Sequence, residues 1–484
     1  MANLGQLAGG RKDKRTTAMK RPAPIEKFLE EPLNTAERIP KERYTSRKFA
    51  RLELEKMWPH VWQLACRETD VANPGDYYEY RIGEESILII REQAERLRAF
   101  YNVCQHRGNR LREGQGNCHS EIRCPYHWWC YNLDGSLKNV PDRFDLEEPI
   151  QDADYGLKQV LVDTWGGFVW INMDPQAEPL LDYLTPVPEQ VAPYQLENWV
   201  CTINLIEVVA TNWKNPQDNF LEIYHFPALH SQASIGGGWG PDYGGQSTVD
   251  PEQMVREGRS QVDLYKLHSR RIFPQGVTGS RPWLRAPDDQ ALVKMMAPRF
   301  FGADEASREG VSLGAEETGL PPGMTARQWL MRRLRGAYEA KGLDLSRYND
   351  SQIIDRWSWH VFPNIVFTLT PTSMFLWRVR PNGNDPNSCI QQLMEFRPLL
   401  PGEKRPRDAE EEFFEQGMPP ARYQERRGQN GYAYSQIMEQ DYVMFCRQQK
   451  GMRSNGFSGL RLTAQERRIR KVHEVIDSYL EREG

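Results

Sequence analysis

Two short stretches of the sequence each pair one cysteine with one histidine. Cys104 precedes His106, and Cys124 precedes His127, with 17 residues between the two pairs. Two loops with these side chains can enclose a 2Fe–2S cluster, with both cysteines on one iron and both histidines on the other. Because neutral imidazoles replace two anionic thiolates, the reduction potential rises to about −150 to +300 mV, against about −400 mV for a plant-type cluster. The spacing therefore predicts an electron relay that supplies a second site.

A structural zinc ion is the alternative occupant, since zinc also accepts two cysteines and two histidines. Zinc modules usually place cysteine beside cysteine and histidine beside histidine, whereas each stretch here mixes the two, so the spacing favours the cluster. Nearby residues follow a pattern that resembles Rieske domains: Asn102, Arg107, Gly108, Gly114, Gly116, Pro125, Tyr126 and Gly135. Trp128 departs from that pattern, because Rieske domains usually have glycine there, and it places a side chain beside the cluster.

A second set of candidate ligands begins at Asp218. This residue, Glu222 and His225 are spaced i, i+4 and i+7, which predicts that all three lie on one face of a helix. Pro227 disfavours helical geometry at the residue before it, so we expect the helix to end there and His230 to turn back beside His225. Two histidines and one carboxylate around an iron ion form a facial triad with open positions for dioxygen and water.

On its own, a pair of histidines at this spacing is a weak signal, because two unrelated histidines in a buried helix are the more common explanation. The cysteine–histidine stretches change that assessment, since an electron relay needs an acceptor. We expect Asp441 to be the third ligand, because it interrupts a mostly apolar helical stripe and a buried carboxylate needs a cation. The alternatives are a surface acid, an arginine partner, and Glu439 as the ligand instead. The rest of the stripe is Tyr434, Ile437, Met438, Phe445 and Gln448.

In this order, the two motifs resemble the catalytic α subunit of Rieske non-heme iron oxygenases, the aromatic ring-hydroxylating dioxygenase family. The resemblance covers roughly residues 42–455, and Gln448, Gln449 and Gly451 after Asp441 also resemble the ligand helix of the family. It implies an α+β fold, with a small all-β Rieske domain and a helix-grip (START-like) catalytic domain whose antiparallel sheet wraps a long helix. It also implies a homotrimer, with or without a small β subunit, in which one cluster serves the neighbouring iron.

Glu222 occupies the family position whose carboxylate bridges the neighbouring cluster and the iron. Many ring-hydroxylating members have aspartate there, whereas some oxygenases of quaternary amines resemble this chain in having glutamate. The resemblance implies that Glu222 hydrogen-bonds the ring N–H of His225 and, across the interface, that of His127; an ordinary surface glutamate is the alternative. Asp218 and Asn219 fit adjacent family positions, for which a supporting catalytic role is implied.

The resemblance implies an oxygenase that activates O2 with electrons from the cluster and hydroxylates or cis-dihydroxylates a hydrophobic, aromatic small molecule. The alternatives are an oxidative demethylase or monooxygenase of a methoxy-aromatic compound or quaternary amine, a Rieske electron carrier without turnover, and a metal-stabilised scaffold. Since no GxGxxG stretch with a βαβ pattern is visible, we expect NAD(P)H to act through a separate ferredoxin or flavin reductase. Aromatic residues that either line a pocket or pack in the core are Trp357, Trp359, Phe362, Phe367, Phe375 and Trp377.

The composition is that of a globular protein. The 484 residues, 39% of them hydrophobic, allow two or three domains. With 62 basic and 66 acidic residues, the net charge is −4. The chain therefore lacks the positive electrostatic field that nucleic-acid binding requires. We see no apolar run of about 18 residues and no signal peptide, so we expect no membrane span and a cytoplasmic location. Two of the eight cysteines are candidate ligands, and we expect the others to be reduced.

We expect three segments along the chain. Residues 1–40 are polar and rich in proline, which predicts a mobile N-terminal arm. Residues 41–175 should form the Rieske domain, and residues 176–484 the catalytic domain. The expected strands are 78–81, 86–91, 97–103, 167–172, 200–210, 364–370, 374–380 (apolar on both faces) and 388–396. The other expected elements are helices at 45–62 and 325–340, a glycine-rich loop at 236–245 near a pocket or interface, and a C-terminal helix capped by Thr463 and Glu466.

Overall fold

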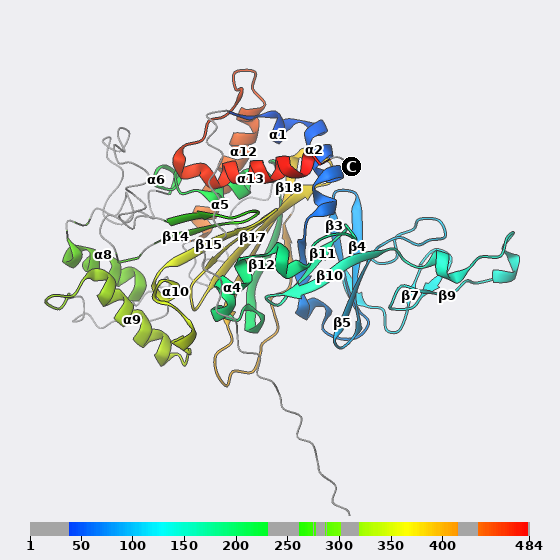
Figure 1. Cartoon of the computed structure of the whole chain (residues 1–484), viewed down its shortest axis with the longest axis horizontal. Helices are drawn as coiled ribbons and strands as arrows, with labels where there is room; N and C mark the ends of the chain where they lie inside the picture. Colours follow the sequence, from blue (N-terminus) through cyan, green and yellow to red (C-terminus); the bar gives the residue numbers. More distant parts are fainter. Residues whose placement is uncertain are drawn as a thin grey trace, which may run out of the picture.

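The computed structural model describes residues 38–230, 261–273, 275–276, 286, 288–301, 319–414 and 434–482. Within these ranges a smaller β body lies beside a larger one, and helices cover the outer face of the larger sheet (Figure 1). This arrangement of a small β domain and a curled antiparallel sheet confirms the expected α+β class. The glycine-rich stretch 236–245 and most of the N-terminal arm lie outside the described residues.

The smaller body holds two antiparallel sheets. Its main sheet has the order β2-β11-β10-β5-β4-β3-β6, and a second sheet has the order β7-β8-β9. The four predicted strands in this region are confirmed. Strands β3 and β4 extend beyond the predicted bounds, whereas β5 ends two residues before the predicted end and β11 begins one residue after the predicted start. The strands are β2 (Gln63–Arg67), β3 (Asp76–Ile82), β4 (Glu85–Gln93), β5 (Arg96–Tyr101), β6 (Gln115–Asn117), β7 (Ile122–Arg123), β8 (Cys130–Tyr131), β9 (Leu137–Asn139), β10 (Gln159–Trp165) and β11 (Phe168–Asn172).

The larger body is built on one sheet with the order β13-β14-β15-β16-β17-β18-β12-β19. Neighbouring strands are antiparallel, except that β19 runs parallel to β12. The strands are β12 (Trp199–Val209), β13 (Gln261–Leu264), β14 (Ser269–Phe273), β15 (Arg356–Val361), β16 (Ile365–Leu369), β17 (Met374–Asn382), β18 (Asp385–Pro398) and β19 (Glu412–Phe414).

Helices α5 (Lys214–Leu221), α12 (Tyr434–Met452) and α13 (Arg467–Leu480) lie over one face of this sheet (Figure 1). The C-terminal helix is confirmed, but Thr463 and Glu466 cap a short 3-10 turn that leads into α13. Helix α9 (Ala326–Ala340) begins at the N-cap Thr325, as expected. The other described α-helices are α1 (Glu42–Thr45), α2 (Arg47–Lys56), α3 (Leu180–Tyr183), α4 (Val187–Val191), α6 (Phe226–Leu229), α8 (Asp289–Phe301) and α10 (Asp350–Ile354).

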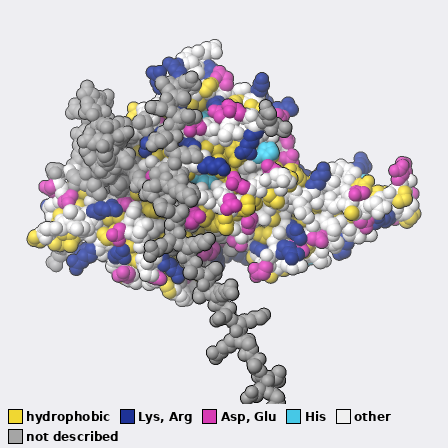
Figure 2. All heavy atoms as spheres, viewed as in Figure 1, with side chains coloured by type: hydrophobic (Ala, Val, Ile, Leu, Met, Phe, Trp, Pro, Cys, Tyr) yellow, Lys and Arg dark blue, Asp and Glu magenta, His cyan; other side chains and the backbone are white. Residues whose placement is uncertain are grey.

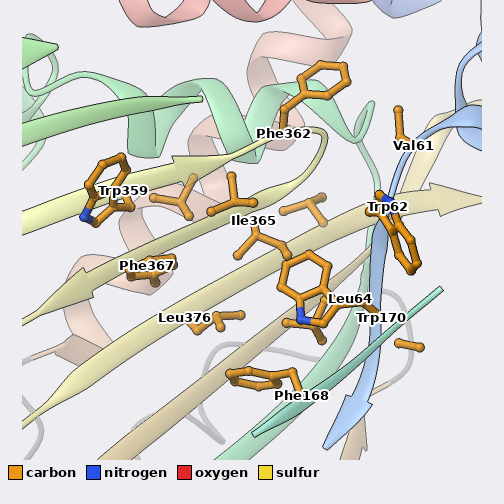
Figure 3. Close-up of a cluster of buried hydrophobic side chains, with 14 of the residues drawn as sticks. Val61, Trp62, Leu64, Phe168, Trp170, Trp359, Phe362, Ile365, Phe367 and Leu376 are labelled. Carbon is orange, nitrogen blue, oxygen red and sulfur yellow. The ribbon is translucent and has the colours of Figure 1, made fainter. Parts of the chain in front are cut away.

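Strand β17 is buried on both faces, as its sequence predicts. Successive side chains alternate, so Leu376 packs toward the smaller body, among Leu64, Phe168 and Trp170 (Figure 3). On the same side, the guanidinium of Arg378 donates to the carbonyl of Ala65 at 2.7 Å. The alternate residues of β17 face the helices. The sheet therefore joins the smaller body on one side to the ligand-bearing helices on the other.

The end of the N-terminal arm differs from the expectation. Residues Ile39 and Pro40 form β1, which pairs with β20 (Gly459–Leu460) near the C-terminus. The face of the molecule in Figure 2 carries interspersed acidic and basic side chains, in keeping with the small net charge. Among the described residues, we find no helix that is long and apolar enough to cross a membrane.

Candidate active site

The two cysteine–histidine loops have the same turn geometry. In each loop the cysteine amide donates to the carbonyl five residues later at 2.8 Å. The residue four positions after the cysteine donates back to the cysteine carbonyl, Gly108 to Cys104 at 3.0 Å and Trp128 to Cys124 at 3.1 Å. Both residues have a left-handed backbone conformation, with φ of 73° at Gly108 and 62° at Trp128. Glycine adopts this conformation without strain, whereas a side chain costs roughly 1–2 kcal/mol, so Trp128 is strained where Gly108 is not.

In these loops the cysteines lie inside and the histidines lie outside. Cys104 and Cys124 are buried, His106 is exposed and His127 is half-buried. The imidazole rings are 4.7 Å apart between centroids, and burial raises the pKa of the Cys104 thiol. Over the described ranges, the four donor atoms do not converge within 4.8 Å. Separate thiol and imidazole pairs fit a two-iron cluster, in which each iron takes like ligands.

Tyr131 supports the cluster loops, a role that the sequence analysis missed. Its hydroxyl lies 3.4 Å from Sγ of Cys104 and accepts a hydrogen bond from the Gln105 amide at 3.0 Å. Burial raises the pKa of Tyr131, so this hydroxyl keeps its proton. His106 stacks on Trp129 with 5.0 Å between centroids. Tyr131 lies in β8, and its spacing from the cysteines does not predict a contact with them.

The second candidate set converges in the larger body. The donor atoms of His225, His230 and Asp441 all lie within 4.8 Å of one another. Oδ1 of Asp441 is 3.0 Å from Nε2 of His230 and 3.8 Å from Nε2 of His225. His230 is 0% exposed and Asp441 2%, whereas His225 is half-buried. Two imidazoles and one carboxylate at this separation fit a single metal ion, and Glu439 is not part of the group.

The second ring nitrogen of each histidine has a fixed acceptor. Nδ1 of His225 is hydrogen-bonded to Oε1 of Glu222, the contact expected from the sequence, and Nδ1 of His230 is 2.8 Å from Oε1 of Gln440. Because these oxygens hold a proton on Nδ1, the lone pair of each Nε2 faces Asp441. Burial lowers the pKa of His225, but the hydrogen bond and charge of Glu222 outweigh this, and the net pKa is raised. Sequence analysis did not identify Gln440, although it adjoins Asp441.

The prediction that Asp218, Glu222 and His225 lie on one helix is wrong. Helix α5 ends at Leu221, and Glu222 is extended, with φ −130° and ψ 175°. The Glu222 carboxylate accepts hydrogen bonds from the backbone amides of Tyr224 and His225, the latter at 3.1 Å. Side-chain bonds of this kind compete with the helical pattern, which explains the early end of the helix. Glu222 and His225 therefore meet through a turn.

The prediction that a helix ends at Pro227 is wrong. Pro227 is the second residue of α6 (Phe226–Leu229), near a helix start, where its missing N–H group has no helical acceptor to lose. His230 follows α6 directly and reaches the group by way of this extra turn.

Asp218 is buried under the N-terminal helix α1. Its Oδ2 accepts a hydrogen bond from the Tyr44 hydroxyl at 2.6 Å, and that hydroxyl lies 2.7 Å from Nε2 of His473. Burial raises the pKa of Asp218 to about 7, which the Tyr44 hydrogen bond opposes. Asn219 is half-buried, and its Nδ2 has no acceptor among the residues that the structure describes. Neither residue belongs to the converging group.

Two of the candidate pocket aromatics, Phe375 and Trp377, lie between the sheet and the helices that carry the ligands. Phe220 of α5 stacks on Trp377 of β17 with 4.4 Å between centroids, and Trp377 is 5.8 Å from Phe375. Met438, three residues before Asp441, belongs to the same apolar cluster. This cluster therefore adjoins the converging ligands. The other four aromatics lie in the main hydrophobic core: Trp357, Trp359, Phe362 and Phe367.

Two family models match the chain. The Rieske [2Fe-2S] domain model covers residues 61–149, and the ring hydroxylating alpha subunit (catalytic domain) model covers residues 183–482. The carnitine monooxygenase oxygenase subunit of Escherichia coli (strain K12) is 34% identical over 194 residues, 40% of this chain and 52% of that protein. The anthranilate 1,2-dioxygenase large subunit of Acinetobacter baylyi is 31% identical over 243 residues, 48% of each chain. The chain thus matches about half the length of these curated relatives.

Solved structures with the same fold include a quaternary ammonium Rieske monooxygenase, with a TM-score of 0.61, 19% identity, and coverage of 92% of this chain and 95% of that one. Naphthalene 1,2-dioxygenase from Rhodococcus sp. has a TM-score of 0.57 and 18% identity, covering 94% of this chain and 97% of that one. These similarities concern the fold of both bodies together.

Proposed function

Because the chain belongs to the ring-hydroxylating α-subunit family, with its Rieske 2Fe–2S domain and mononuclear-iron domain, we propose that it is an oxygenase that acts on a hydrophobic aromatic small molecule. It uses electrons from the cluster to activate O2 and hydroxylates or cis-dihydroxylates this substrate. The observation that carries the proposal is the convergence of His225, His230 and Asp441 in a chain that also contains two cysteine–histidine loops. A second metal centre gives the electrons of the relay a destination.

Each residue of the site has a distinct task. His225, His230 and Asp441 would hold an iron ion, which would supply a redox centre for O2 chemistry. Glu222 and Gln440 keep a proton on Nδ1 of the histidines, which leaves Nε2 free to bind metal. The apolar cluster that includes Phe220 and Trp377 excludes water and packs against the substrate.

The two centres belong to different subunits in this proposal. The cluster loops near β7 and β9 lie at one end of the molecule, away from α5 and α6 (Figure 1). A homotrimer would place one chain's His127 beside the next chain's Glu222, which already contacts His225. Glu222 would then connect the two histidines and provide an electron path. A separate ferredoxin or flavin reductase would supply electrons from NAD(P)H to the exposed histidine side of the cluster.

A quaternary-amine monooxygenase is the second candidate. It is supported by the match to a carnitine monooxygenase subunit and by glutamate at position 222. The stacked rings of Phe220, Trp377 and Phe375 offer aromatic faces that attract cations.

Coupled turnover with isotopically labelled O2 tests these proposals. Purified protein, a surrogate reductase and NADH are supplied with aromatic hydrocarbons, methoxy-aromatics or quaternary amines, and products are identified by mass spectrometry. We expect labelled oxygen in a product of an aromatic compound. Label only in products from amines favours the second candidate, whereas NADH oxidation without labelled product across all three classes supports an electron carrier.

A further inference from the structure

Arg271 in β14 is a buried guanidinium with few partners. The side chain is 2% exposed, and its Nη2 donates to the carbonyl of Gln465 at 2.8 Å. Its Nε and Nη1 are also buried, yet neither finds a hydrogen-bond acceptor in the described part of the chain. A buried charge without a counter-ion is strongly unfavourable, so such an arrangement calls for an anion.

The adjacent residue shows the usual solution to the same problem. Arg270 is also buried, but its Nε donates to Oδ2 of Asp263 at 2.9 Å, and its guanidinium lies 4.3 Å from the centroid of the Trp357 ring. Because side chains alternate along a strand, Arg270 and Arg271 point to opposite faces of the sheet. Among the described residues, the sheet therefore provides a carboxylate that pairs with Arg270 and none that pairs with Arg271.

A second buried arginine adds to the positive charge. Arg468 of α13 is 0% exposed, and it donates to Oγ of Ser269 at 3.0 Å and to the carbonyl of Ser358 at 3.3 Å. Its Nη1 lacks an acceptor over the described ranges. Burial lowers the pKa of Arg468, and the charge of Arg271 lowers it further. Two neighbouring cations are thus buried with mainly neutral partners.

Arg271 pairs with Ser358 of β15, Ser358 with Thr368 of β16, and Thr368 with Phe375 of β17. Directly paired residues share a face, so Arg271 faces the same side of the sheet as the apolar cluster that contains Phe375. Burial lowers the pKa of Arg271 to about 10, whereas the negative charge of Glu222 opposes that shift. Glu222 is not an ion-pair partner, because its carboxylate is bonded to the backbone amides of Tyr224 and His225 and to the His225 ring. An anion that reaches Arg271 would therefore lie on the same side of the sheet as the aromatic cluster.

We propose that Arg271, assisted by the charge of Arg468, binds a carboxylate group of the substrate. This inference rests on the proposed oxygenase function and narrows its substrate class to hydrophobic molecules that carry a carboxylate. A carboxylate supplies the acceptor oxygens and the negative charge that these guanidinium groups lack, and charge-assisted hydrogen bonds are stronger than neutral ones. The apolar part of the substrate would lie against the cluster that contains Phe220 and Trp377.

Binding to the intact holoprotein tests the inference without turnover. Calorimetry compares benzoate with benzamide and hexanoate with hexanamide, pairs that share shape and differ in charge, and acetate reports a simple anion site. We expect wild-type protein to bind at least one carboxylate about tenfold or more tightly than its amide, a difference of about 1.4 kcal/mol. Arg271→Gln should remove this preference, and Arg271→Lys should keep part of it. Arg335→Gln, which removes an exposed partner of Asp350, is the matched control.

Thermal unfolding separates a binding role from a structural one. Without ligand, Arg271→Gln should unfold at a temperature no lower than wild type, because it removes a buried charge that has no ion pair among the described residues, whereas loss of a structural arginine would lower that temperature. The inference is overturned if amides bind as tightly as carboxylates, if Arg271→Gln keeps the preference, or if acetate binds as well as the larger acids. Metal content and labelled-oxygen turnover of the same wild-type preparation show whether the proposed function itself has failed.

Discussion

The cluster loops take all four donors from one short part of the chain, whereas the buried triad takes two histidines from the region after α5 and an aspartate from α12. Each cluster loop closes its own backbone hydrogen bonds. The triad exists only when α5, α12 and the sheet are packed together. We therefore expect the first site to tolerate distant changes, and the second to depend on the packing of the whole larger body.

The two sites also differ in exposure. The cluster presents His106 and His127 toward the surface, which suits the exchange of electrons with another protein. The triad buries His230 and Asp441 beside an apolar cluster, which suits chemistry that excludes water. If the proposed function holds, burial as well as distance would separate electron entry from substrate chemistry.

Asp441→Ala should give the largest effect, because it should disable the buried triad and leave the cluster intact. Loss of one ligand should reduce mononuclear iron and product formation by roughly 100-fold or more, since even groups behind a ligand contribute 10–100-fold. Metal analysis and product assays measure both quantities, and the visible spectrum of the cluster should not change. Glu439→Ala is the matched control, because this neighbouring acid lies outside the triad. If Glu439→Ala loses the iron and Asp441→Ala keeps it, the assignment is wrong.

Cys124→Ala is the reciprocal change. We expect loss of the cluster absorbance and acid-labile sulfide, with mononuclear iron retained, because the loop does not contribute to packing around the triad. Product formation should stop when electrons come through the reductase. Simultaneous loss of both metal centres would contradict the independence of the two sites.

Glu222→Gln should leave the cluster and the mononuclear iron bound but slow electron transfer between them. The amide can still accept a hydrogen bond from Nδ1 of His225, although it no longer carries charge. We expect the rate of cluster reoxidation by O2 with substrate present to fall by roughly 10- to 100-fold, followed by stopped-flow absorbance. An unchanged rate in protein with full metal content would remove Glu222 from the electron path.

Asp218→Asn should change how stability depends on pH. The folded-state pKa of Asp218 is about 7, above its ordinary value of 3.8, so wild-type protein should lose stability from this residue as pH rises from 4 to 7. The neutral amide avoids this loss. Thermal unfolding should show the variant more stable than wild type at pH 8, by on the order of a few kcal/mol, with a smaller difference at pH 4.5. Equal differences at both pH values would contradict the raised pKa.

The smallest expected effect compares the two cluster loops directly. Trp128→Gly should stabilise the smaller body by about 1 kcal/mol, because glycine adopts the left-handed backbone without strain. Gly108→Ala, at the equivalent position of the other loop, should destabilise by a similar amount. Denaturant unfolding monitored by cluster absorbance measures both. A destabilised Trp128→Gly protein would mean that the exposed indole contributes more than the strain removes.

The cluster donors were predictable because their spacing is set by two local turns. Asp441 was predictable as an acid in an apolar stripe and from the residues after it that resemble the ligand helix of the family, whereas its contact with His230 was not, since nothing near it in sequence specifies that histidine. The end of α5 was misplaced, because the bonds from Glu222 to the following amides are decided in the folded turn. Three features became visible only once distant elements were in contact: the Tyr44 hydrogen bond, the Gln440 hydrogen bond, and the two Arg271 nitrogens that lack an acceptor among the described residues.

The metal and sulfide content of purified protein tests the central claim of two different iron sites most directly. Protein produced with sufficient iron should contain one more iron than a 2Fe–2S cluster requires for its sulfide, and the excess should disappear in Asp441→Ala. Zinc in place of iron, an absence of acid-labile sulfide, or an iron content equal to the sulfide content in wild-type protein would contradict the account.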